Sequence, residues 1–208
     1  MNTSWQWGAS ISTELIILLH HGKKKRVYIL ILLSICFIAC CYKGPYTSYG
    51  SIRQKIRSFS KITENYELID TTALYKLDAI QEYTHYNLTE KRVSFYEKDD
   101  AHYYPYTQYF KFYSNGKLAV FFIPKRDTLF LKREMFNPEK AIMGYYYIKG
   151  NDIKIKTVGI INCYLYVFIE KGKIKNDTIT LMLDSSIEEI YKKKTIPKEL
   201  LEGWEPDW

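Results

Sequence analysis

The sequence predicts an all-β fold, an antiparallel meander that closes into a barrel or forms a strongly curved sheet. Three observations support this. Tyrosine is unusually abundant, at 20 of 208 residues, and aromatic side chains favour pleated, half-buried surfaces. Apolar and polar residues alternate in several runs, as in residues 153–158, which is the period of a strand. Pairs of Asn, Asp and Gly separate these runs and predict tight hairpin turns.

The strands follow in order from residue 68. Residues 68–77 are rich in β-branched and aromatic side chains and predict a first strand or a pair of short strands, and residues 92–96 predict another. Residues 108–113 and 118–123 flank Asn115-Gly116. Because Asn and Gly tolerate positive φ, this pair predicts a hairpin with a two-residue type I′ turn.

Two further hairpins continue the meander. Residues 144–149 and 153–158 flank a turn at Gly150-Asn151-Asp152, and a strand from 163 to 175 turns at Asn176-Asp177 into residues 178–183. The irregular tail from 196 to 208 carries Trp204 and Trp208. Two tryptophans are too apolar for a free tail, so we expect it to fold back and cap the sheet.

The N-terminal region predicts an export signal. Residues 23–26 are Lys-Lys-Lys-Arg, and the next 13 residues, 27–39, are predominantly apolar. That length lies within the roughly 7–15 residues of a signal core and below the roughly 18 of a membrane-spanning helix. The segment Phe37-Ile38-Ala39-Cys40 resembles the end of a bacterial lipoprotein signal peptide, which implies cleavage after Ala39 and lipidation, for example with palmitate, at Cys40. Cys36 and Cys41 offer competing registers.

The chain therefore divides into four predicted parts. Residues 1–22 are an extended N-terminus or reflect a misassigned start, and residues 23–39 are the signal peptide. Residues 40–62 form a lipidated tether and a short helix, because Ile52, Ile56, Phe59 and Ile62 recur at offsets of 4, 3 and 3. Residues 63–208 form the β domain with its capping tail. An uncleaved single-pass signal anchor is the alternative to cleavage.

Several segments of the β domain carry a family resemblance. These are Tyr-Phe-Lys-Phe-Tyr-Ser-Asn-Gly-Lys at 109–117, Gly-Tyr-Tyr-Tyr-Ile-Lys-Gly-Asn at 144–151, Gly-Lys-Ile-Lys-Asn-Asp-Thr-Ile at 172–179 and Trp-Glu-Pro-Asp-Trp at 204–208. Together they resemble uncharacterised bacterial lipoproteins with a lipocalin-like β domain. The resemblance implies a lipocalin-like barrel and brings no catalytic residue with it.

Composition narrows the possible functions. The net charge of +7 falls to about +4 once residues 1–39 are removed. The segments expected to be exposed mix Lys with Glu and Asp, which argues against nucleic-acid binding. No spacing among the histidines and cysteines predicts a metal site, and no motif predicts a cofactor. After lipidation of Cys40, only Cys41 and Cys163 remain, too few for a disulfide framework; Cys163 is expected to be a small buried hydrophobic residue.

The sequence thus predicts a non-enzymatic binding or accessory module, attached to a cell-envelope membrane through Cys40. The outer membrane is favoured over the inner one, and the domain would face the periplasm or the exterior as a monomer. Its partners would be a small apolar ligand in the barrel mouth or another envelope protein. An alternative is a hydrolase that uses His102 or the carboxylates of Asp99 and Asp100, although no nucleophile has a recognisable spacing to them.

Overall fold

The structure is a computed structural model that describes residues 28, 42–60, 63–64, 66–83, 91–95, 105–183 and 186–208. The chain forms two compact units. One comprises residues 1–42 and 162–164, and the other comprises residues 43–161 and 165–208. The second unit is the β domain, which therefore begins at Lys43. Among the described residues, no helix is both long and apolar enough to cross a membrane.

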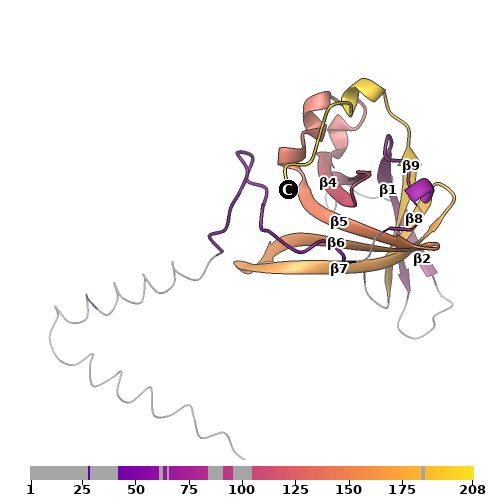
Figure 1. The fold of residues 1–208 in the computed structure, drawn as a ribbon. Coiled ribbons are helices and arrows are strands. Elements are labelled where there is room, and N and C mark those ends of the chain that lie inside the picture. Colours follow the sequence, from indigo (N-terminus) through magenta and orange to yellow (C-terminus); the bar gives the residue numbers. More distant parts are fainter. Residues whose placement is uncertain are drawn as a thin grey trace, which may run out of the picture. The chain divides into compact units, whose positions relative to one another are not determined.

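The predicted all-β fold is confirmed: the domain is a closed antiparallel barrel (Figure 1). Sheet order is β2-β1-β3-β4-β5-β6-β7-β8-β9, and β1 also pairs with β9, which closes eight strands into a barrel with β2 as an extension. This up-and-down arrangement is also that of lipocalins. The strands are β1 (Leu74–Tyr83), β2 (Lys91–Phe95), β3 (Tyr106–Phe112), β4 (Lys117–Pro124), β5 (Ile142–Lys149), β6 (Asp152–Ile161), β7 (Tyr164–Lys175), β8 (Thr178–Met182) and β9 (Ile187–Lys194).

The barrel closes through β1, which pairs with three strands. Its first half pairs with β3 at Tyr75 and Lys76, and its second half pairs with β2 from Ala79 to Tyr83. On its other edge it pairs with β9 along nearly its whole length, with a register shift between Leu77 and Ala79. Such an irregularity bends a strand and increases its twist, as a small barrel requires.

Alternating side chains fill one half of the barrel. The ring of Phe112 makes edge-to-face contacts with two others: its centroid lies 6.0 Å from that of Phe110 and 4.9 Å from that of Tyr146. The three residues belong to a buried interior cluster that also includes Tyr75, Leu77, Leu118, Val120, Ile148, Ile153, Ile155, Ile174, Ile179, Leu181 and Tyr191. This cluster is the main core of the domain, and it accounts for much of the tyrosine content.

A second apolar layer covers the outer face of β3 and β4. Its buried members include Tyr109, Phe121 and Phe136, and Trp204 and Trp208 of the C-terminal tail pack against them. Figure 1 shows the tail, in yellow, beside the short 3-10 segments that follow β4; these segments are η2 (Lys125–Asp127), η3 (Arg133–Phe136) and η4 (Pro138–Lys140), while η5 (Lys198–Leu200) lies in the tail itself. The tail therefore packs on the outer face of β3 and β4 through its two tryptophans.

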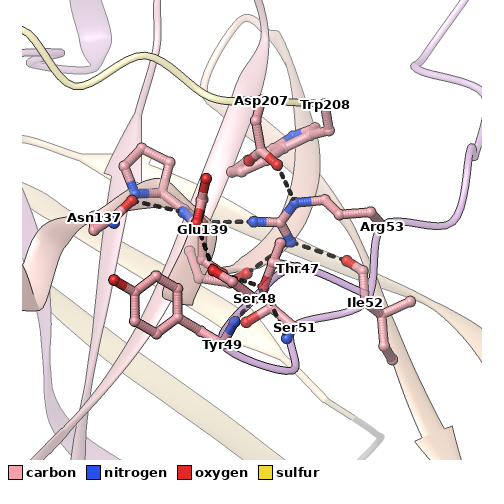
Figure 2. A network of polar contacts seen from close by, with 12 residues as sticks. Thr47, Ser48, Tyr49, Ser51, Ile52, Arg53, Asn137, Glu139, Asp207 and Trp208 are labelled. Carbon is pink, nitrogen blue, oxygen red and sulfur yellow. Dashed lines mark hydrogen bonds and ion pairs between the residues drawn. The ribbon is translucent and has the colours of Figure 1, made fainter. Parts of the chain in front are cut away.

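Residues 43–60 form a strap that packs on the β domain. Residues 51–60 contain no helix, so the predicted N-terminal helix over 51–62 is wrong for the part that the structure describes. The described residues between 63 and β1 include one short 3-10 turn, η1 (Tyr66–Leu68). Figure 2 shows the polar contacts that hold the strap. Arg53 donates hydrogen bonds to the carbonyl oxygens of Pro138 at 2.7 Å and Ala141 at 3.1 Å, and it forms an ion pair with Asp207 at 2.8 Å. These long-range contacts replace the local hydrogen bonds of a helix.

The hairpin turns were predicted at the right residues, but one is of a different type. Only Gly116 has a positive φ, +78°, in the turn between β3 and β4. Tyr113 and Lys117 form the closing hydrogen bond of 3.0 Å, from Tyr113 N to Lys117 O. The turn is therefore a type I turn followed by a left-handed glycine, and the predicted type I′ geometry at Asn115-Gly116 is wrong.

Candidate functional site

The unfilled half of the barrel is the candidate site. Inward-facing residues near the ends of β3, β4, β6, β7 and β9 enclose a cavity of about 240 Å³. Its lining is mainly apolar and consists of Gln108, Phe110, Val120, Phe122, Ile142, Thr157, Val158, Gly159, Phe168, Glu170, Leu183 and Glu189. The interior cluster closes the cavity on one side, since Phe110 and Val120 belong to both. The barrel is thus a cup with a packed base and an open mouth.

Two carboxylates lie in this apolar lining because of strand alternation. Ile174 of β7 is buried in the interior cluster, so Glu170, four residues earlier, shares its inward face. In β9, Glu189 shares the face of buried Tyr191 in the same way. Strand β8 lies between them, and its Leu181 is the register partner of Glu189. Register and alternation therefore direct both acidic side chains into the mouth.

The environment disfavours the charged forms of both carboxylates. Burial, and secondarily the nearby Glu189 charge, raise the pKa of Glu170 to about 7. Burial also raises the pKa of Glu189, although a hydrogen bond from Tyr191 counteracts part of that rise. Near neutral pH, Glu170 is therefore present in both protonated and ionised forms, and the pair can both donate and accept hydrogen bonds.

An aromatic side chain connects the pair to the core. The hydroxyl of Tyr191 donates a hydrogen bond to Glu189 Oε2, and its ring stacks on Phe110 with centroids 4.2 Å apart and planes 20° apart. Since Tyr191 is fully buried, its position is fixed by packing. It therefore holds the Glu189 carboxylate in one orientation at the floor of the mouth.

Glycine at position 159 makes room for an aromatic side chain at the rim. A Cβ atom at Gly159 would lie 2.9 Å from Cε2 of Phe168, which is closer than real Cβ contacts. The Phe168 ring therefore lies across the backbone of β6, where it forms part of the cavity wall. Any side chain at 159 would displace this ring and change the shape of the mouth.

The predicted site residues lie elsewhere. Cys40, and the alternative catalytic residues Asp99, Asp100 and His102, lie outside the described residues. Cys163 is described, and the expectation for it was wrong. It is half-buried in the two-residue turn between β6 and β7, where it and Asn162 both have positive φ, and it is disulfide-bonded.

The sequence contains one indication of each carboxylate: an acidic residue at an inward-facing position of a strand. On the inward face of β7 the order is Phe168, Glu170, Gly172, Ile174, so one charged side chain interrupts an otherwise uncharged series. The same holds for Glu189 between Ile187 and Tyr191 in β9. Recognising these as a pair requires the strand register, because Glu170 and Glu189 are nineteen positions apart in the sequence and the whole of β8 lies between them.

Two further hollows lie on the outer surface. A groove of about 670 Å³ runs between strap residues 53–58 and the side chains of Tyr145 and Trp208. Arg53, one of the three basic residues that line it, forms an ion pair with Asp207 and donates hydrogen bonds to backbone carbonyls. A wider depression of about 920 Å³ lies over β6, β7 and β8 and is lined by four lysines, Lys154, Lys171, Lys173 and Lys175. Only the barrel mouth, among these three hollows of the described residues, is lined by both inward-facing carboxylates, Glu170 and Glu189.

Comparison with known proteins identifies no relative: no protein family, curated protein or solved structure matches this chain. Among the described residues, no group of histidine, cysteine or acidic side chains is arranged to hold a metal ion. Inferences about function therefore rest on the barrel and its mouth.

Proposed function

We propose that this protein is a lipoprotein of the cell envelope whose barrel binds a small, mainly apolar ligand. The observation that carries the proposal is the cavity of about 240 Å³ at the open end of the closed barrel. Eight-stranded barrels have an interior that side chains can fill completely or that can hold one small ligand. Here the interior cluster fills only one half, and the remainder is an apolar hollow with a few polar groups, as is typical of ligand sites.

The cavity size and the carboxylate pair restrict the ligand. A volume of 240 Å³ is below the roughly 300–1,000 Å³ of most ligand pockets, so it suits a small molecule or one end of a longer one. Glu170 and Glu189 favour a ligand end that carries an amine or a hydroxyl group, because a donor or a cation would compensate for the desolvation of a charged carboxylate. Such a ligand would lower the pKa of Glu170 and release a proton on binding at neutral pH.

The envelope location rests on two further features. The apolar segment 27–39 and the Ala39-Cys40 pair resemble a lipoprotein signal, and attachment to the membrane would be through Cys40. Cys163 is disulfide-bonded, and disulfides persist mainly in oxidising compartments outside the cytoplasm. The outer membrane remains the favoured location, and the alternatives of an uncleaved anchor and of a hydrolase using His102, Asp99 or Asp100 remain untested predictions.

Ligand binding can be tested at the rim with two adjacent substitutions. Leu183 lines the cavity, whereas its neighbour Met182 lines the outer depression. A chain beginning at Gly44 is titrated with the apolar fluorescent amine N-phenyl-1-naphthylamine, and native mass spectrometry is used to look for a ligand that copurifies. We expect Leu183→Trp to reduce dye binding and Met182→Trp to leave it unchanged. Equal binding by the unmodified chain and both variants, with no copurifying ligand, would contradict the proposal.

A further inference from the structure

The hairpin of β6 and β7 exposes an apolar surface that the barrel does not explain. Thirteen consecutive residues, 157–169, carry no charged side chain. Several large apolar side chains in this stretch are exposed, among them Val167 at 46% and Ile169 at 56%. Because successive strand residues point to opposite faces, Tyr166 and Phe168 share the inward face of Ile174, while Val167 and Ile169 point outward. An outward-facing apolar surface contributes nothing to the barrel core and marks a contact site.

Basic residues continue the same outer face. Lys171, Lys173 and Lys175 follow Ile169 at every second position of β7, and Lys154 joins them from β6. All four are exposed, and they line the outer depression described above together with two carboxylates, Asp152 and Glu188, so the four lysines leave its lining with an excess of positive charge. The outer face of the hairpin is therefore apolar near its turn and positively charged farther along. Apolar side chains beside lysines form the pattern of a surface that enters the bilayer interface and contacts anionic headgroups.

The hairpin turn also contacts Tyr42, which follows the proposed anchor closely in the sequence. The backbone N–H of Tyr42 donates a hydrogen bond of 2.8 Å to the carbonyl oxygen of Cys163 in that turn. Tyr42 is two residues after Cys40, so the two lie at most about 7 Å apart along the chain. Whether the anchor is the lipidated Cys40 or an uncleaved apolar segment 27–39, it ends within three residues of Tyr42. A membrane that holds this anchor is therefore within reach of the turn.

From these observations we propose that the outer face of the β6–β7 hairpin docks onto an anionic lipid bilayer. Val167 and Ile169 enter the interface, and the lysines of β7 contact the headgroups. The inference goes beyond ligand binding and rests only on the membrane attachment proposed above. Docking would fix the orientation of the barrel at the membrane, and since Phe168 of this hairpin lines the cavity, it would place the mouth close to the lipid.

A depth-sensitive fluorescence measurement tests the contact. The full chain is reconstituted into vesicles of phosphatidylcholine and phosphatidylglycerol with brominated acyl chains, which quench tryptophan on contact. Val167→Trp places the probe on the outer face near the turn. Glu134→Trp is the matched control, because Glu134 is exposed on η3, which packs on the outer face of β3 and β4, and β5 and β6 separate β4 from β7 in the sheet. The unmodified chain supplies the background from its native tryptophans.

We expect brominated lipid to reduce the emission of Val167→Trp and to leave that of Glu134→Trp unchanged. Adding Lys171→Glu and Lys173→Glu to the Val167→Trp chain should abolish the quenching, with the near-UV circular dichroism spectrum retained. Equal quenching at both positions would overturn the inference. Concentration-dependent blue-shifted emission without quenching would identify a second copy as the occupant and would also overturn it.

Flotation of the same vesicles separates this inference from the proposed anchoring. A chain that floats with the vesicles but is not quenched at position 167 refutes hairpin docking and leaves the anchor intact. A chain that does not float refutes both. Dye binding by the chain beginning at Gly44 is measured without lipid, so its result is independent of either outcome.

Discussion

Replacing Glu170 with Gln should stabilise the domain at neutral and alkaline pH and have little effect in acid. The structural cause is the raised pKa of Glu170, about 7 instead of its ordinary 4.5, which results first from burial in the mouth and second from the Glu189 charge. A folded-state pKa above the unfolded one means that the folded chain binds more protons between these values. Its stability therefore falls as the pH rises through this window.

The magnitude follows from the size of the shift. Each pKa unit corresponds to about 1.4 kcal/mol, so a shift of about 2.5 units corresponds to roughly 3 kcal/mol once Glu170 is ionised in the folded state. This value is an upper bound, because Glu170 is only half-buried at an open mouth and water screens its charge. For a domain of 150–250 residues, 1 kcal/mol shifts the Tm by about 2–4 °C. The Tm of Glu170→Gln should therefore exceed that of the unmodified chain by at most roughly 6–12 °C once Glu170 is ionised.

Thermal melts of the chain beginning at Gly44, followed by circular dichroism from pH 5 to pH 8, measure this gap. Glu134→Gln is the control, because it removes the same charge from an exposed position on η3. We expect Glu170→Gln to melt with the unmodified chain at pH 5 and above it at pH 8, and Glu134→Gln to show no such divergence. A gap between Glu170→Gln and the unmodified chain that does not change with pH would refute the assignment of the raised pKa to Glu170.

Four further predictions follow from the fold and the anchor. Gly116→Val should destabilise the domain by roughly 1–3 kcal/mol in thermal melts, because Gly116 has a φ of +78°, whereas Lys117→Val should cost much less; equal melting would contradict the turn geometry. An alkynyl fatty acid should label cells that express the full chain but not its Cys40→Ala variant, and label lost only in Cys41→Ala would move the site by one residue. Lipidation would use the thiol of Cys40, and cleavage after Ala39 would remove Cys36, so Cys41 is the cysteine left to pair with Cys163. Non-reducing peptide mapping should therefore find a disulfide between Cys163 and Cys41, and a disulfide from Cys163 to Cys36 or Cys40 would contradict cleavage after Ala39. Finally, the chain beginning at Gly44 should be a soluble, β-rich monomer, because the β domain begins at Lys43; a helical circular dichroism spectrum would be inconsistent with this.

The strands could be predicted because their signals are local. The turn at Asn176-Asp177, for example, joins strands whose register partners are Lys175 and Thr178, as the sequence indicates. The helix predicted over 51–62 failed for the opposite reason. The offsets of its apolar residues are helical, but Arg53 forms its hydrogen bonds and ion pair with residues more than eighty positions away, and no local pattern encodes these contacts.

The candidate site could be predicted only in outline. A barrel mouth was expected from the meander, but the pairing of Glu170 with Glu189 depends on the register of β7, β8 and β9. Cys163 was misjudged because its neighbours are apolar in sequence. Asn162 and Cys163 form a two-residue turn with positive φ at both positions, and a cysteine in a turn is accessible to a disulfide partner, whereas one within a core strand is not.

The carboxylate pair is the strongest reason to regard the mouth as a functional site and not as a packing defect. A barrel selected for stability alone would have apolar or neutral side chains at these inward positions, because desolvation raises the pKa of both Glu170 and Glu189 and so destabilises the folded state at neutral pH. A group that lowers stability yet contributes to binding should show both effects in one variant. Glu170→Gln is therefore expected to raise the Tm at pH 8 and to weaken binding of an apolar amine. If it raised the Tm and left binding unchanged, the ligand would contact only the apolar wall of the cavity.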